Sequence, residues 1–379
     1  MIKKVLILTF VFRPNVGGAE TYANELTEAL RKRNYFVYVL TYQPISGNQK
    51  GESLEKGKNL EIRRFQWIGD NWFHKLEKYP LFLFAYITPY LFIRSFWWML
   101  WNHKKIDVID AQGLNSSFIA VIFRYLFRKR AVASIMSLYD FQPGSLFARV
   151  VSWTLSRADH VIAESEASKK ELVGIGIPEN KITTFVEWVD LDMFKPLNKK
   201  LAKRNLNLPS NFIVLFVARA IKIKGADIVI DASKRLQKMD ITFVFISRDG
   251  PMVDVLRNES KNSRNILFIE GMEYEKLREY YAAADVFVIP SRYSENAART
   301  VVESFACGTP VIGSNLGAIP SLMDKSVGFL VNPEPVEIGN AIKKLYHDKV
   351  LLNQMTKSSR LYALKKFSEK NVTAIVNCY

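Results

Sequence analysis

Short apolar runs alternate with amphipathic helical patterns along almost the whole chain, and this alternation limits its possible folds more than any other feature. KVLILTF (4–10) is followed by the helical pattern GAETYANELTEALRKR (18–33) and then by FVYVLTY (36–42). Strands that alternate with helices form parallel sheets covered on both faces. The plan starts again at FIVLFVAR (212–219). The expected fold class is therefore α/β, with two doubly wound Rossmann-like domains that face each other across a cleft.

The chain has 379 residues, which suits two domains better than one core. Residues 190–211, DLDMFKPLNKKLAKRNLNLPSN, are polar, contain two prolines and precede a fresh strand. We therefore predict a first domain at 1–190, a linker at 191–211 and a second domain at 212–365. Residues 366–379 are expected to form a helix that returns to the first domain. The apolar start, MIKKVLILTFVF, is interpreted as a buried first strand and not as a signal peptide.

Residues 60–105 interrupt the pattern, because they hold five of the seven tryptophans. Three interpretations stay open: a helix pair buried in the first domain, an interfacial helix that docks on a membrane, or a true membrane span. The apolar core at 80–101 is long enough to span, but Pro89 and Arg94 lie inside it and argue against a span. Tryptophans beside basic residues suit a membrane interface. The flanking basic residues are Arg63, Arg64, Lys75, Lys78, Lys104 and Lys105, and Arg124, Arg128, Lys129 and Arg130 would extend them.

The formal net charge of +16 fits either an ordinary soluble protein with a basic surface or a protein with an anionic partner. The basic residues are spread over both halves without a basic run, so we predict no nucleic acid and favour a phosphorylated substrate or an anionic membrane surface. Two cysteines are too few for a disulfide framework, and the four histidines show no zinc-ligand spacing. We therefore expect no metal and no cofactor, and we interpret Cys307 as a packing residue.

Two loops are candidates for binding phosphate. Gly17 and Gly18 follow the first strand and open the first helix, where free N–H groups and close backbone approach favour an anion. Arg219 ends a strand of the second domain, and Lys224 follows five residues later, just before a helix. A guanidinium fork and an ammonium on one loop suit a diphosphate.

Glu295 and Glu303 lie eight residues apart around a helix start. The paired carboxylates of glycosidases stand about 5 to 9.5 Å apart. Eight helical residues rise about 12 Å, and the second side chain is turned away from the first. The two glutamates therefore fit different parts of one long ligand, such as the sugar and the ribose of a nucleotide sugar.

The sequence resembles the GT-B glycosyltransferases of family 4, which are retaining enzymes. The resemblance rests on GGAE (17–20), VEWVDLDMFKP (186–196), FVARAIKIKG (216–225), FISRDGP (245–251) and ADVFVIPSRYSENAARTVVESFACGTPVIGSNLGAIP (284–320). It implies that Glu295 lies near the donor sugar, that Glu303 binds the ribose, and that Arg219 and Lys224 hold the diphosphate. It also implies that the helix start at Asn296, Ala297 and Ala298 meets the sugar, and it adds Gly250 to the donor site.

Several positions depart from the family pattern. Ala218 and Trp188 stand where glycine is usual, and Asp110 and Gln112 stand near a position where histidine is common. Tyr139, before Asp140, stands where many relatives have an active-site histidine. Tyrosine can hydrogen-bond a sugar or a reacting oxygen, but it does not match histidine as a base at neutral pH. We include Tyr139 and Asp140 among the predicted catalytic residues, with Glu295, Arg219 and Lys224.

The resemblance implies transfer of a hexose from a UDP- or GDP-linked sugar to an acceptor hydroxyl, with retention. We expect the acceptor to be a lipid-linked saccharide used in cell-surface glycan or glycoprotein-glycan assembly. The protein would then lie on the cytoplasmic face of a membrane as a peripheral protein. Two alternatives are a sugar-nucleotide-binding subunit without transferase activity and a GT-B epimerase that acts on the sugar nucleotide.

Overall fold

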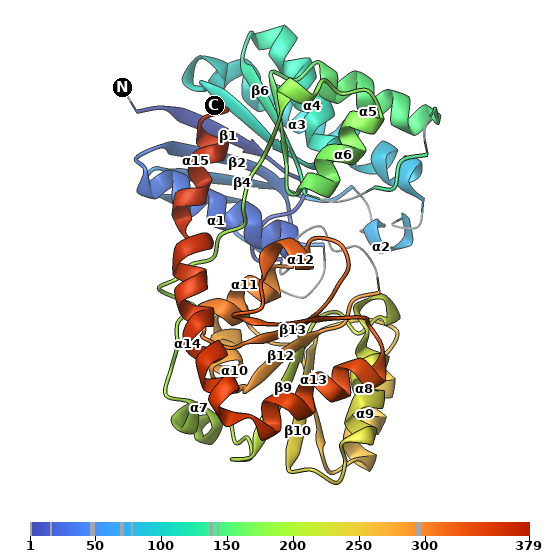
Figure 1. The fold of residues 1–379 in the computed structure, drawn as a ribbon. Coiled ribbons are helices and arrows are strands. Elements are labelled where there is room, and N and C mark those ends of the chain that lie inside the picture. Colours follow the sequence, from blue (N-terminus) through green and yellow to red (C-terminus); the bar gives the residue numbers. More distant parts are fainter. Residues whose placement is uncertain are drawn as a thin grey trace. The chain divides into compact units, whose positions relative to one another are not determined.

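The computed structural model describes residues 2–15, 17–45, 50–68, 72–76, 79–136, 139–142, 144–292 and 298–379. They form two compact units, Met1–Val186 with Asn371–Tyr379, and Glu187–Lys370 (Figure 1). The chain therefore enters the second unit once and then returns to the first. Each unit is built on its own sheet with helices packed against it, so the predicted α/β class with two Rossmann-like sheets is confirmed.

The sheet of the first unit has eight strands in the order β3-β4-β2-β1-β5-β6-β7-β8. All neighbours are parallel except β3, which runs antiparallel to β4. The strands are β1 (Lys4–Leu8), β2 (Phe36–Tyr42), β3 (Leu54–Gly57), β4 (Leu60–Phe65), β5 (Val108–Gln112), β6 (Arg130–Ile135), β7 (His160–Ala163) and β8 (Ile182–Thr184).

Helices cover this sheet on both faces. Leu6 and Leu8 of β1 pack in one cluster with α3 and α4, while Val5 and Ile7 point to the opposite face. The cluster that includes Ala133 of β6 continues the first face under α4, α5 and α6. The helices are α1 (Gly18–Lys32), α2 (Phe73–Leu76), α3 (Pro80–Asn102), α4 (Gly113–Phe127), α5 (Leu146–Ser156), α6 (Glu166–Gly174) and α15 (Val372–Val376), with short 3-10 turns at His103–Lys105 and Glu179–Lys181.

The sheet of the second unit has six parallel strands in the order β11-β10-β9-β12-β13-β14. Central strand β9 reads FIVLFV without a polar residue because both of its faces are covered: Phe212, Val214 and Phe216 enter one core cluster and the alternate residues enter another. The strands are β9 (Phe212–Val217), β10 (Ile241–Ser247), β11 (Ile266–Glu270), β12 (Val286–Ile289), β13 (Val311–Ser314) and β14 (Gly328–Val331).

The helices of the second unit alternate with these strands along the chain. Helices α8, α9 and α13 contribute to the core cluster on one side of the sheet, and α10, α11 and α12 contribute to the other. They are α7 (Lys199–Asn205), α8 (Ala226–Arg235), α9 (Val253–Asn262), α10 (Leu277–Ala283), α11 (Arg299–Ala306), α12 (Ile319–Leu322), α13 (Pro335–His347) and α14 (Lys349–Lys366), with 3-10 turns η3 (Lys222–Lys224), η4 (Tyr274–Lys276) and Glu369–Asn371.

The predicted linker, residues 191–211, packs with the second unit. It contains α7, whose Lys203 ammonium pairs with a carboxylate oxygen of Asp285 at 2.9 Å. The Arg360 guanidinium donates to the carbonyls of Leu191 and Phe194 and so fastens the start of this stretch to α14. At the other end of the chain, α15 lies with the strands of the first unit (Figure 1).

The aromatic segment 60–105 forms β4, α2 and α3, and it is partly core and partly surface. On α3, Ile87, Leu91 and Trp98 are buried in the first unit. Neighbouring Trp97 and Trp101 are 60% and 82% exposed. Over the residues that it describes, the structure contains no helix both long enough and apolar enough to span a bilayer.

Candidate active site

The predicted site residues that the structure describes fall into two groups, one in each unit. The first unit contains Gly17, Gly18, Tyr139 and Asp140, and the second contains Arg219, Lys224, Gly250, Ala298 and Glu303. Glu295, Asn296 and Ala297 lie outside the described residues, and Ala298, which follows them, is the buried residue that precedes α11. Each group is therefore described within its own unit.

Arg219 lies where β9 ends, on the loop that leads to α8. Its Nε donates to Oδ1 of Asp249 at 2.9 Å, and Asp249 follows the neighbouring strand β10. The carbonyl of Asp249 accepts from the N–H of Ala220 at 2.8 Å. The guanidinium is thus oriented from one side while 59% of its side chain stays exposed. This leaves a fixed cation at the carboxyl end of the central strands, which is the edge where ligands bind in open α/β sheets.

Gly250 is required by the contact between these two loops. Its φ is +127°, and a Cβ placed on it would lie 2.7 Å from the carbonyl carbon of Ala220. That same carbonyl accepts from the N–H of Met252 at 2.9 Å. A side chain at Gly250 would push the two loops apart, because the atoms it meets belong to the backbone. The packing of the loop therefore explains the glycine within FISRDGP.

A third loop, after β12, holds the turn that contains Lys224. The N–H of Arg292 donates to the carbonyl of Ile223 at 2.8 Å, and its guanidinium donates to the carbonyl of Lys222 at 2.8 Å and to Oδ1 of Asp227 at 2.6 Å. Turn η3 is thereby fixed at the edge of the sheet beside β12. Asp249 and Arg292 are positioning residues that the motifs contain, and Asp227 is another that follows FVARAIKIKG; the sequence analysis gave none of them a role.

Glu303 lies on α11 inside the second unit, with only 3% of its surface exposed. Its two carboxylate oxygens accept from the hydroxyls of Tyr274 and Tyr281, each at 2.9 Å. Burial raises the pKa of this carboxyl, and the nearby Arg299 guanidinium opposes the increase. Arg299 itself pairs with the buried Glu187 at 2.8 Å. Glu303 is thus an internal acceptor in this structure, and its contact to a ribose stays a prediction.

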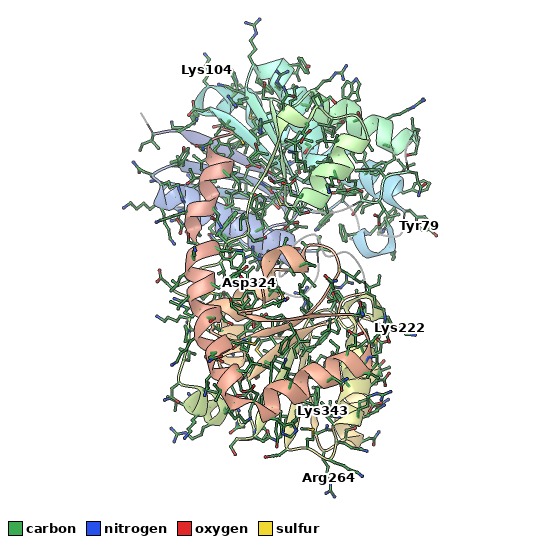
Figure 2. All side chains as sticks on the ribbon, viewed as in Figure 1. Tyr79, Lys104, Lys222, Arg264, Asp324 and Lys343 are labelled. Atoms are coloured by element: carbon green, nitrogen blue, oxygen red, sulfur yellow. The ribbon has the colours of Figure 1, made fainter. Side chains whose placement is uncertain are left out.

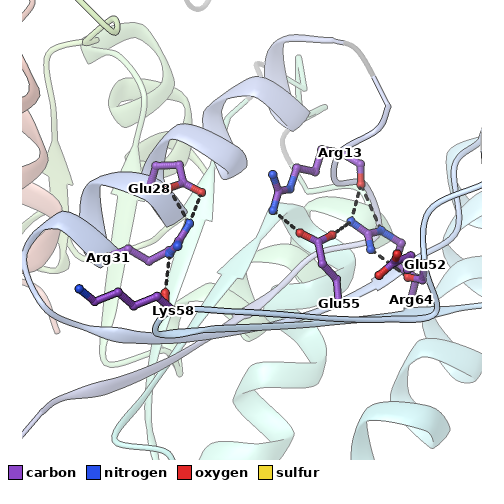
Figure 3. A network of polar contacts seen from close by, with 7 residues as sticks. All are labelled: Arg13, Glu28, Arg31, Glu52, Glu55, Lys58 and Arg64. Atoms are coloured by element: carbon purple, nitrogen blue, oxygen red, sulfur yellow. Dashed lines mark hydrogen bonds and ion pairs between the residues drawn. The ribbon is translucent and has the colours of Figure 1, made fainter.

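In the first unit, the loop that leads to Gly17 is held by a buried arginine. Figure 3 shows Arg64 donating to the backbone carbonyl of Arg13 at 3.1 and 3.2 Å and to the carboxylate of Glu55 at 3.0 Å. The guanidinium of Arg13 donates to the other oxygen of Glu55 at 2.6 Å. Gly17 precedes α1 and Gly18 is its first residue. The assignment of Arg64 to an exposed basic flank was wrong, because its side chain is 2% exposed and fixes this loop.

Tyr139 and Asp140 lie in the loop between β6 and α5, and Glu171 of α6 fixes their backbone. The carboxylate of Glu171 accepts from the N–H groups of Tyr139 at 3.0 Å and Phe141 at 3.2 Å. Asp140, between them, is exposed and has φ +49°. The Tyr139 ring stacks on Phe141, and burial raises the pKa of its hydroxyl to about 12. Tyr139 therefore offers a neutral hydroxyl at physiological pH. Glu171 lies in none of the motifs, so nothing in the sequence indicated its contact with this loop.

Asp110 and Gln112 lie in the core of the first unit. Oδ1 of Asp110 accepts from Gln112 at 2.6 Å and Ser134 at 2.9 Å, and Oδ2 accepts from the hydroxyl of Tyr379 at 2.6 Å. Burial raises the pKa of Asp110 to about 6. The two residues form an internal polar network that joins β5, β6 and the segment after α15.

The described part of the chain contains two thiols, and both are buried. Within the described residues, no three His, Cys, Asp or Glu side chains are grouped so that they could hold a metal ion. Cys307 and Cys378 are buried free thiols, and burial raises the pKa of each. Cys307 packs in the core of the second unit.

Two family models match successive parts of the chain. Residues 16–193 match Glycosyltransferase Family 4, and residues 198–362 match Glycosyl transferases group 1. The chain belongs to glycosyltransferase family 4. The resemblance inferred from the motifs is thereby confirmed, and with it the assignment of the chain as a glycosyltransferase.

This family-4 glycosyltransferase is 29% identical over 209 residues to D-inositol 3-phosphate glycosyltransferase 2 of Catenulispora acidiphila, and the match covers 50% of this chain and 48% of that protein. The chain is thus matched over about half the length of that relative. Sucrose-phosphate synthase from Thermosynechococcus elongatus has the same fold, with a TM-score of 0.81, 21% identity and coverage of 99% of this chain and 97% of that one. Anabaena Alr3699/HepE in complex with UDP also has this fold, with a TM-score of 0.77, 20% identity and coverage of 99% of this chain and 98% of that one. These structures confirm the GT-B fold.

Proposed function

We propose that this family-4 glycosyltransferase moves a hexose from a UDP- or GDP-linked donor to an acceptor hydroxyl, with retention at the anomeric carbon. The proposal is supported by the hydrogen-bonded set of loops after β9, β10 and β12, which contains Arg219 and Lys224 at the carboxyl edge of the second sheet, where ligands bind in folds of this class. Anabaena Alr3699/HepE, which has the same fold, has been solved with UDP and with UDP-glucose. The second unit is accordingly proposed to bind the donor and the first unit the acceptor.

Arg219 and Lys224 would act on the leaving diphosphate. Negative charge grows on the leaving group as the glycosidic bond breaks, so cations held in advance stabilise the transition state more than the ground state. Asp249 keeps the Arg219 fork oriented, and the Arg292 contacts keep η3 in place for Lys224. No metal is needed in this proposal, because side chains neutralise the charge.

The remaining predicted residues would contact the two substrates. Glu295, Asn296, Ala297 and Ala298 are proposed to surround the donor sugar. Glu303 would reach the ribose by exchanging the hydroxyl of Tyr274 or Tyr281 for a sugar hydroxyl. On the acceptor side, Tyr139 would donate its hydroxyl proton in a hydrogen bond to a substrate oxygen, because its raised pKa keeps it protonated.

The acceptor is proposed to be a lipid-linked saccharide, such as a polyprenyl-diphosphate sugar, used in cell-surface glycan or glycoprotein-glycan assembly. The exposed tryptophans of α3 support a peripheral position on the cytoplasmic face of a membrane, where such an acceptor would be reached. The chemistry requires only a nucleophilic hydroxyl on the acceptor. The lipid carries that hydroxyl to the protein surface.

A donor panel tests the proposal. The protein is incubated with labelled UDP- and GDP-hexoses and a membrane extract, and the products are separated into lipid-linked and free sugars. Label in the lipid fraction, with the anomeric configuration of the donor, is the expected result. Arg219→Ala and Lys224→Ala should abolish most of it, while Lys222→Ala on the same turn should not. A lack of transfer with every donor and every extract would overturn the proposal.

A second candidate function is a sugar-nucleotide-binding subunit, and it is favoured by Tyr139. A hydroxyl with a pKa of about 12 does not replace histidine as a base near neutral pH. Calorimetric binding of UDP or GDP without turnover would support this candidate. Conversion of the free sugar nucleotide, without an acceptor, would instead indicate an epimerase.

A further inference from the structure

We propose that the outer side of α3, continued by the end of α4 and by α5, is a docking face for an anionic lipid membrane. This docking face is defined by six exposed apolar side chains and by the basic residues beside them. The apolar residues are Phe82, Ile93, Trp97, Trp101, Leu126 and Leu146. The basic residues are Lys104, Lys105, Arg128, Arg149 and Arg157. The proposal deepens the proposed function, on which it rests only for the idea that the acceptor is a lipid.

Helix α3 is apolar on the side that faces water as well as on the side that faces the core. Its exposed residues include positions 81, 85, 89, 93, 97 and 101, which are four apart and form a row that winds around the helix by about 40° at each step. They read Leu, Ala, Pro, Ile, Trp and Trp. The helix of a soluble domain normally presents polar residues on that side. A contiguous exposed apolar row therefore indicates a surface with a partner.

Exposed apolar residues also occur on α4, which packs beside α3, and on α5, which packs beside α4. The rings of Phe84 on α3 and Phe118 on α4 lie 5.7 Å apart, and Phe118 lies 6.4 Å from Trp153 on α5. At the other end, Phe96 of α3 packs on Phe127 of α4 at 5.9 Å. Leu126 is 57% exposed and Leu146 is 71% exposed. Exposed apolar residues therefore occur on three helices that are joined to one another by ring contacts.

The charge of this face is mainly positive. Residues 80–158, which include α3, α4 and α5, contain nine Lys and Arg against three Asp, and Asp107, Asp110 and Asp140 all lie outside the three helices. Arg124 pairs with Asp159 and Arg130 donates to the carbonyl of Cys378, while Lys105 and Arg157 bond locally, to Asn102 and to the carbonyl of Trp153. Lys104, at the end of α3, projects from the surface of the first unit (Figure 2). The face thus combines aromatic area with cations, as interfacial membrane proteins do.

The edge of the face at α5 is hollowed. A pocket of about 560 Å³ opens between α5 and the end of α6, and Arg149, Ser152, Trp153 and Arg157 contribute to its wall. The guanidinium of Arg157 lies 4.4 Å from the centre of the Trp153 ring, which fixes both side chains. Two guanidiniums beside an indole give a lipid phosphate charged partners next to an apolar surface.

The charge distribution favours a membrane over a second copy of the chain. A two-fold dimer through this face would bring the same cations together without an acid to pair with them. An anionic membrane surface instead attracts each Lys and Arg, while the headgroup region accepts Trp and Tyr rings. Trp98, which follows Trp97 directly, is 8% exposed and belongs to the core. The docking pair is Trp97 and Trp101.

Flotation with vesicles tests the docking face. The full chain is mixed with vesicles of phosphatidylcholine, with and without phosphatidylglycerol, at low and high salt. We expect binding to the anionic vesicles that weakens with salt, and quenching of tryptophan fluorescence by brominated lipid. Trp97→Ala with Trp101→Ala should lower binding at least tenfold and remove most of the quenching. Val350→Ala with Leu361→Ala, two exposed apolar residues of α14, is the matched control and should bind like wild type.

The cations are tested separately. Lys104→Gln with Lys105→Gln should weaken binding to anionic vesicles roughly fivefold per lysine, and Lys238→Gln with Lys343→Gln in the second unit should not. Failure to bind anionic vesicles at low salt would overturn the proposal. If the Trp97→Ala, Trp101→Ala variant binds anionic vesicles as well as wild type, the contact lies elsewhere and the proposal is also overturned.

Two further measurements separate this proposal from its alternatives. Sedimentation that shows a dimer, lost in the Trp97 and Trp101 variant, would make the face a protein interface and would refute the membrane assignment. Turnover of a water-soluble acceptor analogue by the same variant distinguishes the two proposals. If the variant turns over the analogue normally but no longer floats with vesicles, docking is supported. If the wild type floats with vesicles but does not turn over the analogue, the result counts against the proposed reaction only.

Discussion

Replacing Gly250 with alanine should loosen the donor half of the second unit. The residue has φ +127°, a conformation that costs a residue with a Cβ roughly 1–3 kcal/mol. The new Cβ would also meet the backbone of Ala220, which takes part in two hydrogen bonds between the loops, at 2.8 and 2.9 Å. Losing one of these bonds costs about 1 kcal/mol. The expected loss of unfolding free energy is about 2–4 kcal/mol, or roughly 5–15 °C in the melting temperature of this unit.

Two other glycines of the same unit separate the contributions. Gly271 has φ +72° with open space around its Cβ position, so Gly271→Ala should show the backbone strain alone, about 1 kcal/mol. Gly339 lies inside α13 with nothing near its Cβ position. Gly339→Ala should stabilise the helix by about 0.5–1 kcal/mol. The three substitutions add the same methyl group, so the loss of unfolding free energy should be largest for Gly250→Ala, smaller for Gly271→Ala and reversed for Gly339→Ala.

Calorimetry of the three variants measures the ranking, and hydrogen exchange locates the damage. In Gly250→Ala, the amides of Ala220 and Met252 should lose protection, while amides of β11 should not. Donor affinity should also fall, because Asp249 precedes Gly250 and orients Arg219. If Gly250→Ala were as stable as Gly339→Ala, with Ala220 still protected, the contact between the two loops would not constrain the structure and our reasoning about this loop would be refuted.

Three further predictions concern turnover and pH. Lys224→Ala should lower kcat/KM for the donor at least tenfold, about 1.4 kcal/mol of transition-state stabilisation, in an assay of nucleotide release, and Lys222→Ala is the matched control. The pKa of Asp110, raised by burial from 3.8 to about 6, means that the folded chain binds its proton more tightly than the unfolded chain. The contribution of this carboxyl to stability should therefore be fully present below about pH 4 and fall by about 3 kcal/mol as the pH rises past 6, and denaturant titrations should show it as a pH-dependent difference between wild type and Asp110→Asn. Tyr139, with its pKa raised to about 12, stays protonated near neutral pH. Tyr139→Phe should lower turnover without removing an ionisation from the pH–rate profile, and the loss of one near pH 7 would contradict the role proposed for its hydroxyl.

The sheets could be predicted because a strand buried on both faces appears in the sequence as a continuous apolar run. β9 reads FIVLFV since every side chain enters a core, and a loop and a helix must follow such a strand. Arg219 and Lys224 were predicted as site residues on similar grounds, because ligands bind where a strand ends and a helix begins.

The partners that hold the site could not be predicted, because they come from distant parts of the chain. Arg292 bonds to Asp227, 65 residues earlier, and Glu171 holds the turn of Tyr139, 32 residues earlier. Each residue type was visible, but nothing in its neighbourhood identified the partner. The burial of Glu303 depends in the same way on tyrosines 22 and 29 residues before it.

Helix α3 shows a different limit. Periodicity identifies the buried side of a helix only when the other side is polar. On α3 both sides are apolar, so adjacent Trp97 and Trp98 look alike in sequence although one is exposed and the other is buried. The exposed side became visible only when the sheet beneath the helix was known.

The return of residues 371–379 to the first unit has a consequence for the order in which the protein is made. Asp110 is hydrogen-bonded by Tyr379, 269 residues later in the chain, and Arg130 donates to the carbonyl of Cys378. A ribosome therefore completes the whole second unit before the first unit receives these contacts. Until then Asp110 has only Gln112 and Ser134 as donors. The nascent first unit must wait through the synthesis of residues 187–370 in a less stable state, and during that interval it is most exposed to proteases and chaperones.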